Sequence, residues 1–236
     1  EQKISARDLN VLERNFISKL KHPSPDKLYF ITELYNKKDL SKALKEAKKL
    51  MKNFGESYIL FNLLGVINAA MENFEDSKKY YTKAIKLNPN ESEFYYNLAN
   101  LFYRYDLFDD AIFYYYKTMK INPDHLNAII NLAKIYQNYG EFENAQNKYM
   151  QALSINTSSV LLLNNYSYFL IGRGKSKKAV LLLQESLKLE QKNSSTLNIL
   201  GVAYQDLGKI KKAIECFKGA ITNDKFNLDC HLNLSK

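Results

Sequence analysis

The side chains that most often carry catalysis or bind metals are few and widely separated in this sequence. They are His22, His125, His231, Cys216 and Cys230. Their spacing matches no metal-ligand pattern, and two cysteines make no disulfide framework. His125 follows a proline in a turn and is expected to be solvated, and nothing beside Cys216 is expected to lower its pKa. The 8 glycines are dispersed and form no phosphate loop. We therefore predict no enzymatic activity, metal or cofactor for these residues.

Asparagine, in contrast, recurs at one pair of adjacent positions every 34 residues. The pairs are Asn62 and Leu63, Tyr96 and Asn97, Ile130 and Asn131, Asn164 and Asn165, Asn198 and Ile199, and Leu232 and Asn233. Seven of these twelve positions are Asn, whereas the 25 asparagines of the 236-residue chain would supply about one by chance. A side-chain amide both donates and accepts hydrogen bonds, so it can pair with a peptide backbone of any sequence. The alternative is that these amides only keep an exposed face soluble in an asparagine-rich chain.

The elements that would position these amides follow from the same period. Ala111, Ala145 and Ala179 lie 34 residues apart, and Ala213 and Ala43 fit the same lattice. Helices of about 12 to 15 residues are marginal alone in water and must be held by their neighbours. Small residues at fixed positions let paired helices approach closely, and Pro89 and Pro123 would end the second helix of a pair.

Bulky, small and aromatic residues recur at fixed positions of the 34-residue period. In residues 92–125 these positions hold Tyr95, Leu98, Ala99, Phe102, Ala111, Tyr115, Thr118 and Pro123. This pattern resembles that of the tetratricopeptide repeat. The resemblance implies an all-α, right-handed superhelical solenoid of helix-turn-helix hairpins. We predict six units, at 24–57, 58–91, 92–125, 126–159, 160–193 and 194–227. The first unit matches loosely, keeping Phe30, Leu34, Ala43, Ala47 and Leu50. Residues 1–23, with apolar residues at helical spacing between 5 and 20, are predicted to form an N-terminal capping helix, and 228–236 to begin a truncated seventh unit.

In the tetratricopeptide family the first helix of each unit lines a concave groove, which the resemblance places over the asparagines. The predicted peptide-binding residues are Asn62, Tyr96, Asn97, Asn100, Tyr103, Arg104, Asn131, Lys134, Asn138, Asn164, Asn165, Tyr168, Asn198 and Gln205. Tyrosine suits such a surface because it offers a large contact area with few rotors to freeze. If successive first helices lie about 10 Å apart, an extended peptide that rises about 3.3 Å per residue would meet one asparagine roughly every third residue.

Two binding patterns of the family can be compared with these residues, one that the chain matches and one that it does not. A similar asparagine ladder occurs in the repeat region of O-GlcNAc transferases, and Asn97, Asn131, Asn165 and Asn233 stand at its position. Chaperone-binding tetratricopeptide domains hold a C-terminal carboxylate with lysine, arginine and asparagine. The corresponding residues here are Asn62, Val66, Asn97, Asn127 and Asn131. They lack the positive charge of that clamp, so we do not expect capture of an acidic chaperone tail.

The net charge of +9 does not form an even basic stripe. Residues 1–57 and 173–225 carry excesses of +5 and +6, whereas residues 58–172 carry −2. We therefore do not expect a nucleic-acid partner. No run of apolar residues is long enough for a membrane span, and we expect a cytoplasmic location.

The predicted function is a protein-binding or peptide-binding scaffold with an Asn-rich concave groove. Self-association through the exposed C-terminal repeat is a further option that the pattern leaves open. The stretch from Leu34 to Gly65 also resembles the start of bacterial multidomain proteins in which such repeats precede an enzyme domain. The alternative is therefore the N-terminal, substrate-recruiting region of a larger glycosyltransferase or sulfotransferase whose catalytic domain follows Lys236.

Overall fold

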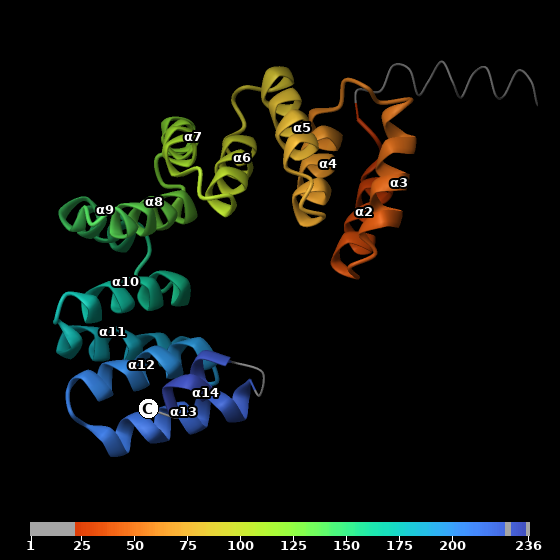
Figure 1. Ribbon diagram of the computed structural model, residues 1–236. Helices are drawn as coiled ribbons and strands as arrows, with labels where there is room; N and C mark the ends of the chain where they lie inside the picture. Colours follow the sequence, from red (N-terminus) through yellow and green to blue (C-terminus); the bar gives the residue numbers. More distant parts are fainter. Residues whose placement is uncertain (1–21, 225–227, 235–236) are drawn as a thin grey trace, which may run out of the picture. The chain divides into compact units, whose positions relative to one another are not determined.

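The described part of the chain is entirely helical. A computed structural model describes residues 22–224 and 228–234, and within these ranges it contains 13 α-helices and no strand (Figure 1). The prediction of an all-α array of helical hairpins is confirmed. The capping helix predicted within residues 1–23 falls almost wholly outside the described residues.

The helices alternate between first and second helices of successive hairpins. The first helices are α2 (Pro25–Asn36), α4 (Tyr58–Ala70), α6 (Ser92–Arg104), α8 (Leu126–Asn138), α10 (Val160–Gly172) and α12 (Ser194–Asp206). The second helices are α3 (Leu40–Met51), α5 (Phe74–Leu87), α7 (Phe108–Ile121), α9 (Phe142–Ile155), α11 (Ser176–Leu189) and α13 (Ile210–Asn223). The helix α14 (Leu228–Leu234) comes last. From α6 onward each first helix begins 34 residues after the one before, as does α14.

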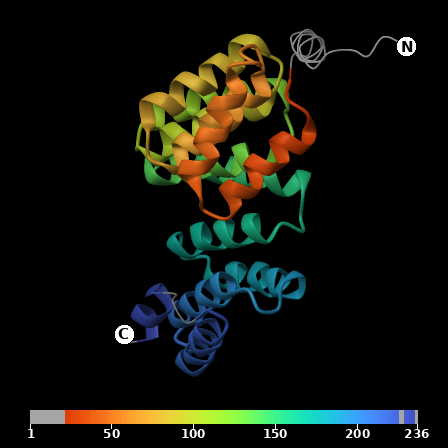
Figure 2. The ribbon, with the colours of Figure 1, turned by 90° about the vertical axis from the view of Figure 1, so that its right-hand side faces the viewer.

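The chain divides into two compact units, which we describe separately. Unit 1 comprises residues 1–123 and unit 2 residues 124–236. In unit 1 each helix packs on its hairpin partner, α3 packs on α4, and α5 packs on α6 (Figure 2). First helices also contact one another, α4 with α6 in unit 1, and α8 with α10, α10 with α12 and α12 with α14 in unit 2. We call the surface formed by these helices the first-helix face of each unit.

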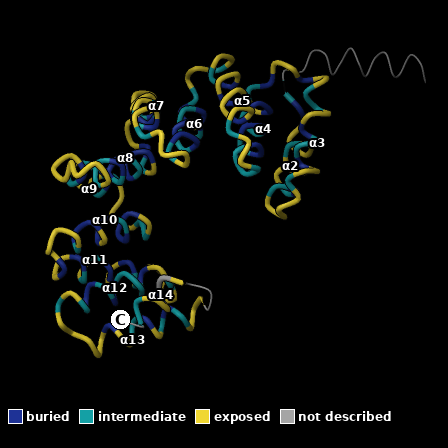
Figure 3. The backbone as a smooth tube through the Cα atoms, in the orientation of Figure 1, coloured by how far each residue is buried: buried dark blue, intermediate teal, exposed yellow. Residues whose placement is uncertain are grey.

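Small residues inside each hairpin allow this packing. Ala111, Ala145 and Ala179 are fully buried, as predicted, and buried and exposed positions alternate along the helices (Figure 3). Glycine replaces alanine on the first helix in two hairpins. A Cβ built on Gly65 would lie 2.5 Å from the ring of Tyr81, and one on Gly201 would lie 2.3 Å from a ring carbon of Phe217. The aromatic ring therefore occupies the space that a side chain would need.

The turn inside each hairpin requires one residue with left-handed backbone. In unit 2 this residue is glycine, with φ of 75° at Gly140, 67° at Gly174 and 70° at Gly208. In unit 1 the same position holds Lys38, Glu72 and Asp106, with φ of 64°, 61° and 57°. Since left-handed backbone is unfavourable for residues with a Cβ, the turns of unit 1 carry a strain that those of unit 2 avoid.

Two sequence-based assignments of individual residues were wrong. Phe30 was assigned to the packing pattern, but it is 45% exposed and Ile31 is fully buried instead. The register of the first hairpin is kept, since α2 and α4 end at equivalent positions and Leu34 and Ala43 are buried as expected, but Phe30 lines an open pocket beside α3. His125 was expected to be solvated, but it is 7% exposed and lies at the N-cap of α8, where its Nδ1 accepts a hydrogen bond from the backbone N–H of Ala128 at 3.2 Å.

Candidate functional site

An asparagine pair links two first helices of unit 1. Asn62 lies on α4 and Asn97 on α6, and Nδ2 of Asn97 donates a hydrogen bond to Oδ1 of Asn62 at 3.0 Å. Both side chains are half-buried. The bond uses one N–H of Asn97 and one acceptor site of Asn62, so each amide keeps further hydrogen-bonding capacity. The two asparagines thus connect neighbouring repeats and remain partly exposed.

A small cavity opens beside this pair, between α4 and α6. Its volume is about 180 Å³. It is lined by Tyr35, Val66, Ala69, Ala70, Tyr81, Asn97, Asn100, Leu101 and Arg104. Three of the predicted binding residues, Asn97, Asn100 and Arg104, are therefore brought together in one cavity. The other lining residues were not predicted, although the adjacent small residues Ala69 and Ala70 in the last turn of α4 indicate that space is left there.

Arg104 ends α6 and reaches across to α4. Its Nη1 donates a hydrogen bond to the carbonyl oxygen of Ala69 at 2.8 Å, which fixes the guanidinium at the edge of the cavity. The same carbonyl accepts the backbone N–H of Glu72, so Ala69 is also part of the turn. Burial raises the pKa of the Tyr81 phenol, while the hydrogen bond with Ser77 and the charge of Arg104 act in the opposite direction. The cavity thus has one fixed positive charge and a phenol that stays protonated.

The predicted tyrosines of unit 1 contribute more to packing than we expected. The ring of Tyr96 lies 6.0 Å from that of Tyr115, and the ring of Tyr103 lies 5.7 Å from that of Phe108. Both predicted tyrosines are half-buried. The hydroxyl of Tyr115 donates to Oδ1 of Asn100 at 2.6 Å and orients this amide at the cavity wall.

Unit 2 repeats the asparagine pair on its last two first helices. Nδ2 of Asn233 on α14 donates to Oδ1 of Asn198 on α12 at 3.1 Å. In both units the paired residues are 35 positions apart in the sequence. This shared spacing was a signal from which the pairing could have been predicted. Asn165 instead bonds the Leu161 carbonyl of its own helix, at 2.8 Å.

The other predicted residues of unit 2 lie on its first-helix face at different depths. Asn131, Lys134 and Gln205 are half-buried, and Asn138 is exposed. Tyr168 is 59% exposed and is the predicted tyrosine most open to a partner.

Asn164 does not belong to an accessible surface, which corrects the sequence-based expectation. It is only 8% exposed and sits in a polar cluster of α10, α11 and α12. Its Nδ2 donates to Thr196 Oγ1 at 2.9 Å, and its Oδ1 accepts from Ser186 Oγ at 3.1 Å. Small hydroxyl residues at these two neighbouring positions leave room for the amide inside the unit. Asn164 therefore stabilises the fold of unit 2.

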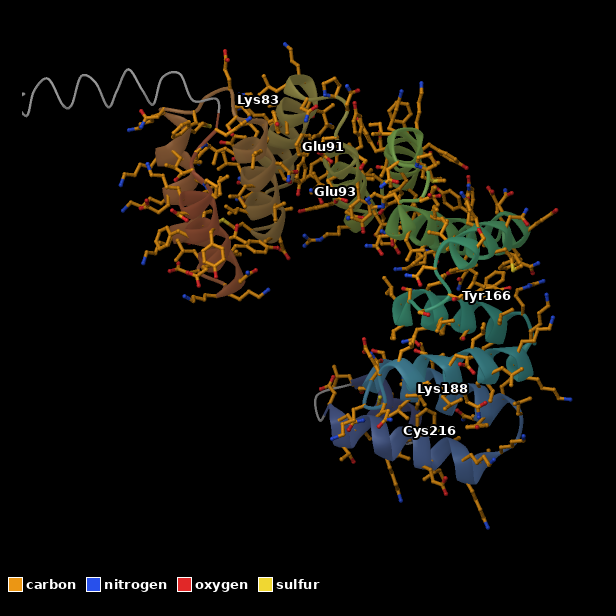
Figure 4. All side chains as sticks on the ribbon, turned by 180° about the vertical axis from the view of Figure 1, so that it is seen from behind. Lys83, Glu91, Glu93, Tyr166, Lys188 and Cys216 are labelled. Carbon is orange, nitrogen blue, oxygen red and sulfur yellow. The ribbon has the colours of Figure 1, made fainter. Side chains whose placement is uncertain are left out.

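Groups with other chemistry are not assembled in the described part of the chain. Cys216 lies on α13 (Figure 4), where burial and the nearby Glu215 carboxylate raise the pKa of its thiol to about 11. A thiol with this pKa is almost entirely protonated at neutral pH and is a weak nucleophile. Among the described residues no group of three or more His, Cys, Asp or Glu side chains could hold a metal ion. Within the same ranges, every helix is too short or too polar to cross a bilayer.

Stacked helical hairpins define a helical-repeat protein, and here their first helices carry polar side chains. Comparison with protein-family models identifies the type of repeat. Tetratricopeptide-repeat models match residues 62–125 and 194–227, and the model of YpiA-like C-terminal tetratricopeptide repeats matches residues 127–193. The chain belongs to the tetratricopeptide-repeat family. A comparison with curated proteins gave no match.

Solved structures show the same fold at low sequence identity. PilW, described as a widely conserved type IV pilus biogenesis factor, aligns with a TM-score of 0.76 and 14% identity over 88% of this chain and 96% of its own. Yeast Tom70 aligns with a TM-score of 0.72 and 18% identity over 89% of this chain and 45% of its own. YrrB, described as a tetratricopeptide protein with an unusual peptide-binding site, aligns with a TM-score of 0.57 and 15% identity over 80% of this chain and 98% of its own.

Proposed function

We propose that this protein is an interaction scaffold that binds an extended peptide segment of a partner along its first-helix faces. The observation that carries the proposal is the grouping of Asn97, Asn100 and Arg104 around one cavity of unit 1. Amides hydrogen-bond to backbone groups regardless of sequence, so they suit a partner held in extended form. The peptide-binding site named for YrrB, which shares the fold, supports the same class of function.

The asparagine pairs refine how such a face would work. Asn62 and Asn97 hold one another in place, as do Asn198 and Asn233, so fewer rotamers remain to be frozen when a ligand binds. Lower conformational entropy loss is a general source of affinity in preorganised sites. We therefore expect these amides to bind backbone groups with little rearrangement.

Combined replacement of Asn97, Asn131 and Asn165 by alanine tests the proposal. Peptides selected from a displayed random dodecapeptide library on the full chain serve as probes, and fluorescence anisotropy measures their Kd. We expect at least about tenfold weaker binding, because losing several hydrogen bonds of about 1 kcal/mol each exceeds the 1.4 kcal/mol of a tenfold change.

The matched control replaces three exposed asparagines elsewhere, Asn90, Asn147 and Asn223, by alanine. It should leave the Kd unchanged, and circular dichroism should show equal helical content in both variants. Unchanged peptide binding by the first variant would contradict the proposal.

A further inference from the structure

The cavity between α4 and α6 is lined by a positively charged side chain. Arg104 is the only charged residue among those that line it. In the described part of the chain no ion pair joins Arg104 to a carboxylate, and its one hydrogen bond goes to the Ala69 carbonyl. A guanidinium has five N–H donors, so most of them remain for a ligand.

The neighbouring side chains add donors without adding charge. Asn97 and Asn100 line the same cavity, and each amide carries two N–H groups. The oxygen of Asn100 accepts the Tyr115 hydroxyl, and Nδ2 of Asn97 donates to Asn62. Both amides are thereby held at fixed positions beside the guanidinium, as a site for an oxyanion requires.

The size of the cavity limits what can enter. Ala69 and Ala70 end α4 with small side chains, whereas the equivalent positions on α6 hold Tyr103 and Arg104. The cavity volume of about 180 Å³ compares with roughly 30 Å³ for one water molecule in the liquid. It therefore accommodates a group of a few heavy atoms, such as a carboxyl group with one or two methylenes.

We propose that this cavity is a carboxylate subsite, in which Arg104, assisted by Asn97 and Asn100, binds one carboxylate of the peptide held on the first-helix face. The inference rests on the proposed function and specifies the chemistry of the ligand. The subsite differs from the clamp of chaperone-binding domains, whose five positions hold no cation here, because its charge comes from the last turn of α6. The carboxylate belongs to an acidic side chain or to a free C-terminus, and the experiment separates the two.

Three short peptides distinguish these sources when titrated onto the isotope-labelled full chain. The first is a capped pentapeptide with a central glutamate, the second has glutamine instead, and the third ends in a free carboxylate without an acidic side chain. Chemical shifts of the Arg104 Nε–Hε group and of the Asn97 and Asn100 amides report binding at the cavity. We expect the glutamate peptide or the free carboxylate to bind about tenfold more tightly than the glutamine peptide, since ionised acceptors form the stronger hydrogen bonds.

Two substitutions at the cavity, each with its own control variant, locate the effect. Arg104→Gln should remove the preference for the carboxylate, whereas Arg173→Gln should keep it. Arg173 is a suitable control because it lies at the end of another first helix, α10, with its guanidinium 4.1 Å from the Phe142 ring centre. Ala70→Glu leaves Arg104 intact but supplies an internal carboxylate, so it should also abolish the preference, while Ala70→Gln should retain at least part of it.

Equal affinity for all three peptides in the wild-type chain would overturn the subsite. If the Asn97, Asn131 and Asn165 variant then still weakened binding of every peptide, the first-helix face would stand as the binding surface and only the carboxylate proposal would fail. A carboxylate preference that persisted in Arg104→Gln and Ala70→Glu would equally overturn it.

Discussion

At the scale of single residues, two adjacent asparagines of α10 have different surroundings. Asn164 is buried and exchanges hydrogen bonds with Thr196 and Ser186, whereas half-buried Asn165 bonds a carbonyl of its own helix. We predict that Asn164→Ala destabilises the protein by about 1 to 3 kcal/mol, because it removes the central partner of a buried polar cluster. Asn165→Ala should change stability by no more than about 0.5 kcal/mol. Urea denaturation of both variants measures the difference, and equal effects would contradict it.

The same pair shows how far residue-level prediction from the sequence could go. The 34-residue period correctly placed asparagines on the first helices, because periodicity fixes the position along a helix. It could not predict their exposure, since that depends on neighbours from other hairpins. Ile130, at the position equivalent to Asn164, is also buried, so this position packs between repeats in both hairpins. Asn164 is buried because Ser186 and Thr196 are small and polar and can bond its amide. Since Thr196 belongs to the next repeat, the sequence of one repeat alone does not predict this burial.

At the scale of elements, the hairpin turns of the two units differ in backbone strain. Glu72 has a φ of 61°, where unit 2 uses glycine. Left-handed backbone costs a residue with a Cβ about 1 to 2 kcal/mol, and glycine loses up to about 1 kcal/mol in chain entropy. We predict that Glu72→Gly stabilises the protein by roughly 0.5 to 1 kcal/mol, and that Gly140→Ala destabilises it by a similar amount.

Thermal unfolding checks these opposite signs, with a raised Tm expected for the first variant and a lowered Tm for the second. Asp106→Gly should gain less than Glu72→Gly, because aspartate tolerates left-handed backbone better. A lowered Tm for Glu72→Gly would show that the Glu72 side chain contributes more than its backbone strain costs.

The elements themselves were the most predictable part of the fold. Alanines, prolines and aromatics at fixed spacing predicted an all-α array of helical hairpins, because helix pairing requires small residues at set positions. The exception was in α2, where Ile31 is buried and Phe30 lines an open pocket beside α3. Spacing along the chain does not say which neighbours cover a side chain, so the exposure of Phe30 could not be predicted from it.

At the scale of the whole molecule, neighbouring hairpins contact one another within each unit, and a local defect should stay local. Gly65 tests this, because a Cβ there would meet the Tyr81 ring at 2.5 Å. Gly65→Ala gains up to about 1 kcal/mol in helix propensity but incurs about 1 to 3 kcal/mol of overpacking, so we expect net destabilisation. Gly172→Ala is the matched control, since a Cβ on Gly172 meets nothing within 4 Å.

Hydrogen exchange measured by mass spectrometry shows where the destabilisation is felt. Gly65→Ala should lower the protection of α4, α5 and their neighbours in unit 1 and leave α12 and α13 protected. Gly201→Ala, which brings a Cβ within 2.3 Å of the Phe217 ring, should give the reverse pattern. A uniform loss of protection in either variant would mean that the two units unfold as one cooperative body, and the nearest-neighbour description would then be wrong for this chain.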